Sequence, residues 1–69
     1  MPRTYTLVIT IDGESNDACS ARYILVNPNG STCGTSGYPM EGRLHDVLHR
    51  IESFLEHNIK ECEEESTHE

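Results

Sequence analysis

The stretch "LHDVLHRIESFLEHNI", residues Leu44 to Ile59, decides the fold that the sequence predicts. Its apolar residues recur at intervals of three and four, which places them on one face of a helix. The stripe consists of Leu44, Val47, Leu48, Ile51, Leu55 and Ile59, with Phe54 at its edge. Cys62 continues the stripe, so we expect it to be a small core or interface residue rather than a reactive thiol.

The ends of this helix are less regular than its centre. Pro39 and Glu41 suit a first helical turn, because proline needs no hydrogen-bond acceptor there and a carboxylate favours the positive end of the helix dipole. Gly42 suits it less, at a cost of about 1 kcal/mol relative to alanine. The end of the chain, "ECEEESTHE", is acidic. We therefore expect a single domain over residues 1–62 and a frayed tail over residues 63–69.

Two runs before the helix alternate with the period of two that is typical of strands. In "TYTLVITI", Thr4 to Ile11, the apolar face carries Tyr5, Leu7, Ile9 and Ile11, and the other face carries Val8 among threonines. In "SARYILVN", Ser20 to Asn27, one face carries Ala21, Tyr23 and Leu25, and the other carries Arg22, Ile24 and Val26. The polar residues 12–17 between the two runs predict a turn.

A third strand is possible in "STCGTS", residues 31–36, although Gly34 weakens that assignment. This order of elements predicts an α+β fold, in which a small antiparallel sheet of two to three strands packs on one long C-terminal helix. The second sheet face would then expose Val8, Ile24 and Val26. That is enough apolar surface to indicate self-association or a partner.

Composition narrows the class of protein. The 69 residues include 12 acidic and 5 basic ones, for a net charge of −7. Phosphate contacts need clustered Lys and Arg, so nucleic acid is disfavoured as a direct partner. Acidity favours solubility or attraction to a basic protein. Three cysteines at irregular spacing indicate reduced thiols of a cytosolic protein, and neither a signal peptide nor a membrane span is predicted.

Few residues in the sequence are candidates for metal binding or catalysis. His45 and His49 are spaced to chelate zinc on a helix, but no third ligand is evident, and a solvated face with a His–Glu pair through Glu52 is the favoured alternative. Cys33 would need a neighbouring base to act as a nucleophile, and the sequence indicates none. We therefore predict no catalytic, cofactor-binding or metal-binding residues, and a non-enzymatic interaction module.

The segment after the second strand carries a family resemblance. A turn at Pro28-Asn29 precedes Cys33, Thr35 and Gly37 in a Cys-x-Thr-x-Gly pattern. With the helix that follows, the chain resembles the amino-terminal domain of HicB-type antitoxins over residues 4–57. The matching helix positions are Glu41, Leu44, Val47, Ile51, Phe54 and Leu55. The sequence departs from the family at residues 30–32, where Leu-Pro-Gly is usual, at Pro39 in place of a threonine, and at residues 42–43 in place of Glu-Ala.

The resemblance implies a compact βββα domain that binds a small basic ribonuclease toxin, HicA, and blocks its active site. It also implies dimers or higher oligomers. Members of the family usually add a carboxy-terminal DNA-binding domain that represses their own operon. The residues after Ile59 supply only an acidic tail, so autorepression by direct DNA binding is not expected here.

Two functions follow as expectations. The first is a HicB-like antitoxin domain that neutralises a basic toxin in the cytoplasm. The alternative is a small acidic phage-type inhibitor, such as an anti-CRISPR protein or a nucleic-acid mimic, that acts on a nucleic-acid-binding complex in the host cytoplasm. Both need a protein partner and neither a cofactor nor a membrane, and we expect a homodimer. The predicted contact residues are Glu52, Glu56, Glu61, Glu63, Val8, Ile24 and Val26.

Overall fold

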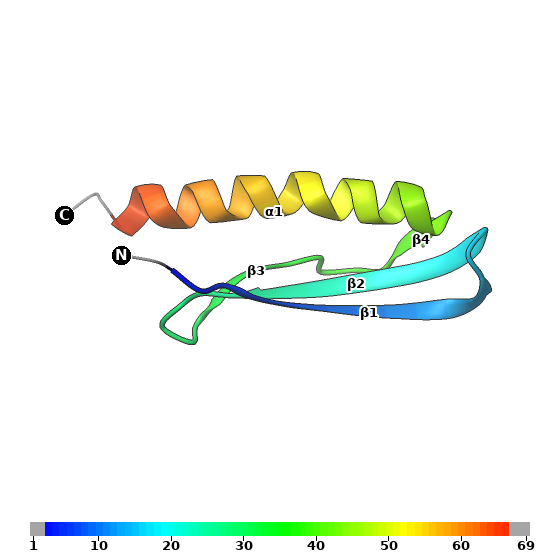
Figure 1. The fold of residues 1–69 in the computed structure, drawn as a ribbon, viewed down its shortest axis with the longest axis horizontal. Helices are drawn as coiled ribbons and strands as arrows, with labels where there is room; N and C mark the ends of the chain where they lie inside the picture. Colours follow the sequence, from blue (N-terminus) through cyan, green and yellow to red (C-terminus); the bar gives the residue numbers. More distant parts are fainter. Residues whose placement is uncertain (1–2, 67–69) are drawn as a thin grey trace.

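A computed structural model describes residues 3–66 of the chain. Its elements are β1 (Thr6–Ser15), β2 (Ala18–Val26), β3 (Thr32–Thr35), β4 (Met40–Gly42) and α1 (Leu44–Ser66). β2 is the central strand and pairs antiparallel with β1 on one side and with β3 and β4 on the other. α1 lies along one face of this sheet (Figure 1). The predicted α+β fold is confirmed, with β4 as an additional strand.

The β1–β2 hairpin is longer than the sequence predicts. Its strands are joined by a two-residue turn, Asn16–Asp17, rather than by a loop over residues 12–17. Polar side chains on β1 do not end the strand, because its backbone stays paired with β2 to Ser15. The register shifts at Gly13, whose φ of 139° leaves room only for glycine, since a Cβ there would lie 2.7 Å from the carbonyl oxygen of Ala18.

The third strand is confirmed, since Thr32–Thr35 pairs with β2. Gly34 does not weaken it, because this glycine faces α1 at very close range. A Cβ at Gly34 would lie 2.5 Å from the side-chain oxygen of Asn58. The missing side chain is therefore what lets α1 approach β3.

The predicted helix start at Pro39 and Glu41 is wrong. Met40 instead pairs with Ala21 of β2 and is buried, so this segment forms β4. Gly42 has a φ of 143°, which lies outside the helical region and separates the strand from the helix. Burial of Met40 against the sheet outweighs the local preference of a proline and a carboxylate for a first helical turn.

The helix begins at Leu44, two residues after β4 ends at Gly42. The carbonyl of Arg43 accepts from the N–H of Val47 at 2.9 Å, so Arg43 occupies the cap position. The N–H of Leu44 donates to the carbonyl of Asn16 in the hairpin turn at 2.8 Å. α1 then runs to Ser66. The expected division into a domain and a frayed tail stays a prediction, and residues 67–69 of that tail lie outside the described residues.

The core lies between β2 and α1. Its buried members are Ala21, Tyr23, Leu25, Met40, Val47 and Ile51. These include the predicted inner face of β2 and the centre of the predicted helical stripe. The backbone of α1 runs beside β2, β3 and β4 but not beside β1, so Leu7 and Ile11 stay 39% and 48% exposed. No helix formed by the described residues is long and apolar enough to cross a membrane.

Candidate functional site

The outer face of the sheet, opposite α1, gathers the apolar residues predicted as contacts. Val8 of β1 lies directly across from Ile24 of β2, and Thr35 of β3 continues the row. Val8 is 52% exposed and Ile24 is 48% exposed. Val26 is half-buried at one end of the same face. The predicted sheet residues therefore do lie together on one uncovered surface.

A shallow hollow of about 350 Å³ opens on this outer face. Its apolar floor comes from Val8 and Ile24, and its polar rim from Thr10, Arg22 and the segment that follows β3. The row of Thr10 and Arg22 adjoins the row of Val8 and Ile24, since each pair is opposed across the β1–β2 ladder. The guanidinium of Arg22 places one positive charge at the rim of this hollow.

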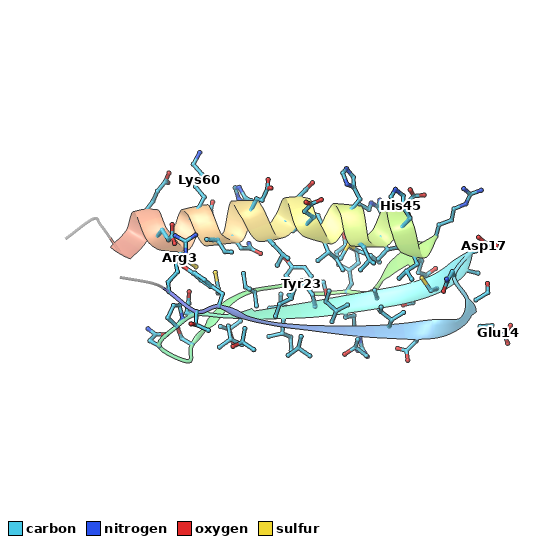
Figure 2. The ribbon with its side chains drawn as sticks, in the orientation of Figure 1. Arg3, Glu14, Asp17, Tyr23, His45 and Lys60 are labelled. Atoms are coloured by element: carbon cyan, nitrogen blue, oxygen red, sulfur yellow. The ribbon has the colours of Figure 1, made fainter. Side chains whose placement is uncertain are left out.

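The predicted acidic residues lie on α1, on the other side of the molecule. Glu52, Glu56 and Glu61 are exposed. Figure 2 shows the side of α1 that points away from the sheet, marked by His45 and Lys60. The seven predicted contact residues thus fall on two surfaces that face away from each other. A single flat partner cannot touch both.

Glu63 differs from the other acidic residues because the fold already uses it. Its carboxylate forms an ion pair with Arg3, and it accepts a hydrogen bond from the hydroxyl of Tyr5 at 3.5 Å. Burial, and then the neighbouring Glu63 carboxylate, raise the pKa of Tyr5 above its ordinary value. These contacts hold the residues before β1 against the C-terminal half of α1.

Two histidines, His49 and His57, pair with carboxylates on the same helix. His49 Nδ1 lies 3.5 Å from a carboxylate oxygen of Glu52, and His57 Nε2 lies 3.1 Å from one of Glu61. Both pairs are exposed, so each contributes little to stability. Among residues 3–66 no group of three His, Cys, Asp or Glu is placed to hold a metal ion. The geometry therefore adds no third ligand to the predicted pair of His45 and His49.

Cys33 and Cys62 lie together where β3 meets α1. The thiol of Cys33 contacts the carbonyl of Asn58 at 3.4 Å, and the sulfur of Cys62 lies 3.9 Å from the carbonyl of Cys33. Both are half-buried, and Cys33 packs against the core. These positions suit small residues that fill space at the end of the sheet, as the sequence predicts for Cys62.

Asn58 is a residue that the sequence analysis missed. It accepts a hydrogen bond of 2.9 Å from the hydroxyl of Tyr23, the large buried side chain at the centre of β2. Figure 2 shows Tyr23 between the sheet and the helix. Burial, together with the Cys33 thiol, raises the pKa of Tyr23. The signal was available, since Asn58 is a polar residue that falls within the apolar stripe of the helix.

Comparison of the chain with protein families, with curated proteins and with solved structures finds no match. The resemblance to HicB-type antitoxins is therefore carried by the residues of this sequence alone, and its functional implications are proposals.

Proposed function

We propose that this protein is a non-enzymatic inhibitor that binds a basic protein through the exposed side of α1. A HicB-like antitoxin domain, which neutralises a basic ribonuclease toxin in the cytoplasm, is the function we favour. The observation that supports it most directly is the pair of exposed carboxylates of Glu52 and Glu56, one turn apart on the same side of α1. With a net charge of −7, the chain attracts a basic partner over distance and repels nucleic acid.

The most informative variant reverses the charge of a carboxylate that forms no ion pair within residues 3–66. Glu56 meets that condition, whereas Glu63 is held by Arg3. Glu56→Lys is therefore expected to weaken partner binding by about tenfold or more, since close interfacial charge pairs contribute ~1.5 kcal/mol upward. Glu14→Lys is the matched control, because it makes the same exchange at an exposed position on the distant β1 strand.

Co-expression with a HicA-type toxin is the direct test. The antitoxin proposal predicts that growth is restored and that a toxin complex elutes from a sizing column, with restoration weaker for Glu56→Lys than for Glu14→Lys. Persistent toxicity with no complex would refute the proposal.

The same carboxylates favour a second candidate, a phage-type inhibitor of a host nucleic-acid-binding complex. Neighbouring carboxylates on a helix, such as those of Glu52 and Glu56, can occupy part of a groove that otherwise holds phosphates. This inhibitor would compete with nucleic acid, and the competition would weaken steeply as salt is raised. Binding that is insensitive to both salt and nucleic acid would exclude it. For either function we propose that the chain acts as a homodimer.

A further inference from the structure

One edge of the sheet is open over the whole length of β1. The strand has ten residues and pairs only with β2 among the described elements. Natural edge strands are commonly protected by lysine, proline or a covering helix. The sequence of β1, "TLVITIDGES", holds neither lysine nor proline, and α1 does not run beside it.

The backbone groups that face this open edge can be identified from β2. Tyr23 donates its N–H to the side chain of Ser36 and accepts the N–H of Ser36 at 3.2 Å, so its backbone points toward β3. Ile9 is paired opposite Tyr23. In an antiparallel ladder, opposed residues either both point toward each other or both point away. The N–H and C=O of Ile9 therefore point outward, and so do those of Leu7 and Ile11.

The same odd-numbered residues direct apolar side chains to the helix side of the edge. Leu7 is 39% exposed and Ile11 is 48% exposed, whereas Ile9 is half-buried. The flank of α1 above them carries both apolar and charged residues. Glu63 marks that flank, because it contacts Arg3 and Tyr5 just before β1. At 100° per residue Leu48 lies on the same flank, 38% exposed.

We propose that two copies of the chain join through this edge, with their β1 strands antiparallel and a two-fold axis at Ile9. This deepens the homodimer named with the proposed function by giving its interface and register. Ile9 then faces Ile9 of the second copy, and Leu7 faces Ile11. All three pairs use outward backbone groups, so they are hydrogen-bonded pairs. The two sheets become one continuous sheet.

A second copy in this register keeps the carboxylates of the two β1 strands apart. In this register Asp12 falls opposite Thr6 of the other copy, and Glu14 falls opposite Thr4. No carboxylate of the strand faces another carboxylate, which would be destabilising. The apolar pairs Leu7–Ile11 and Ile9–Ile9 coincide with the hydrogen-bonded positions, and Val8 meets Thr10 on the outer face. The strand is therefore complementary to itself.

The dimensions of the molecule are compatible with a stable dimer. A standard interface covers ~800 Å² of each partner. The principal extents are 46, 21 and 18 Å, and β1 runs along the long dimension (Figure 1). An interface along this side, formed by the strand edge and the flank of α1 that carries Leu48, has room for that area.

The first test compares Ile11→Lys with Ile24→Lys by sedimentation equilibrium. Both isoleucines are 48% exposed in β-strands, and only Ile11 lies on the proposed interface. The wild-type protein is expected to be a dimer, Ile11→Lys to raise its dissociation constant at least tenfold, and Ile24→Lys to leave it unchanged. Circular dichroism checks that both variants are folded. A monomeric wild-type protein, or a dimer lost in Ile24→Lys and kept in Ile11→Lys, overturns the proposal.

The second test fixes the register by cross-linking, with oxidised glutathione as the oxidant and wild type as the background. Cα atoms of a hydrogen-bonded antiparallel pair lie ~5.5 Å apart, within the range of a disulfide. Ile9→Cys is expected to cross-link with itself. Leu7→Cys and Ile11→Cys are expected to cross-link when mixed and not separately. If Leu7→Cys alone formed as much disulfide dimer as the mixture of Leu7→Cys and Ile11→Cys, the strands would pair in a different register and the proposed one would be overturned.

The dependence on salt concentration distinguishes dimerisation from partner binding by the proposed inhibitor. Two copies that each carry a charge of −7 repel, so salt is expected to strengthen the dimer by screening. Binding of a basic partner is expected to weaken under the same conditions. A monomeric Ile11→Lys protein that still binds its partner supports the inhibitor function and shows that dimerisation is a separate property. A salt-strengthened dimer that inhibits no basic protein leaves the interface in place and refutes the function.

Discussion

The two faces of β2 differ in how much of them the rest of the chain covers, although both arise from the same alternating sequence. On the inner face Ala21, Tyr23 and Leu25 are 1%, 3% and 2% exposed beneath α1. On the outer face Ile24, flanked by two of these residues, is 48% exposed. The strand therefore carries enough apolar residues for two covered faces, and the described chain covers one. The alternating pattern specifies which residues share a face of the sheet. Whether that face is buried depends on how many helices the chain supplies to cover it.

The largest difference in stability between the two faces is expected when one isoleucine on each side is replaced by alanine. Ile51 of α1 is 1% exposed against the inner face, so Ile51→Ala should lower the free energy of unfolding by ~2–5 kcal/mol through lost burial and the cavity it leaves. The same exchange at Ile24 on the outer face should cost ~1 kcal/mol or less. Urea denaturation of both variants measures the difference. Equal losses would mean that the outer face is covered in solution.

The next effect concerns the close approach of β3 to α1. Gly34→Ala places a Cβ 2.5 Å from Asn58 and is expected to lower the free energy of unfolding by ~1–3 kcal/mol through overpacking. Truncation of the facing side chain in the double variant Gly34→Ala, Asn58→Ala should recover part of that loss relative to Asn58→Ala alone. Thermal unfolding of the four proteins gives the coupling energy. Additive losses would show that the two residues do not meet.

A smaller effect is expected at Tyr23. Tyr23→Phe removes the hydrogen bond to Asn58 and should cost ~1 kcal/mol at neutral pH. Because the folded state raises the pKa of Tyr23, the stability linked to its protonated form is fully present below the ordinary tyrosine pKa of ~10. That stability is lost as the pH rises through the folded pKa. The variant should therefore lose less stability than wild type above that pH.

The measurement for Tyr23→Phe is the denaturation midpoint at several alkaline pH values. Tyr5, whose pKa is also raised, supplies the control, since Tyr5→Phe should remove a separate part of the same dependence. Identical alkaline curves for wild type and Tyr23→Phe would contradict the assignment.

The smallest effect is expected from the ion pair of Arg3 and Glu63. The side chains are 60% and 39% exposed, so Arg3→Ala should cost less than ~1 kcal/mol. The loss should shrink further in high salt because exposed charges are screened. Thermal unfolding at low and high ionic strength checks both statements. A loss comparable to that of Ile51→Ala would place this pair among the main determinants of the fold.

The sequence predicted the elements whose residues repeat with a clear period. The faces of β2, the centre of the α1 stripe at Val47 and Ile51, and the short third strand are confirmed, whereas Leu48 of the stripe is exposed. The helix start was wrong because Met40 gains more from burial against Ala21 than a helical turn at Pro39 would provide. Pairing with a strand about twenty residues earlier is a tertiary effect that local preference does not contain.

The candidate site was predictable in composition but not in arrangement. Apolar outer residues and acidic helical residues could each be selected by their spacing, as Ile24 and Glu56 were. Their separation onto opposite sides of the molecule required knowing which face of the sheet the helix covers. Asn58 could be recognised from the sequence as a polar residue in an apolar stripe, but its partner, Tyr23, could not be identified without the structure.

The hydrogen bond from Leu44 to the carbonyl of Asn16 has a consequence for protein engineering. It joins the first helical residue to the hairpin turn, so an insertion at Asn16–Asp17 would displace the start of the helix. The loop at Gly30 is different, since it is exposed and its backbone hydrogen bonds, from Gly30 to Asn27 and from Asn27 to Ser31, stay within the loop. An affinity tag or fluorescent label placed beside Gly30 should leave the fold intact, and the hairpin turn should not accept one.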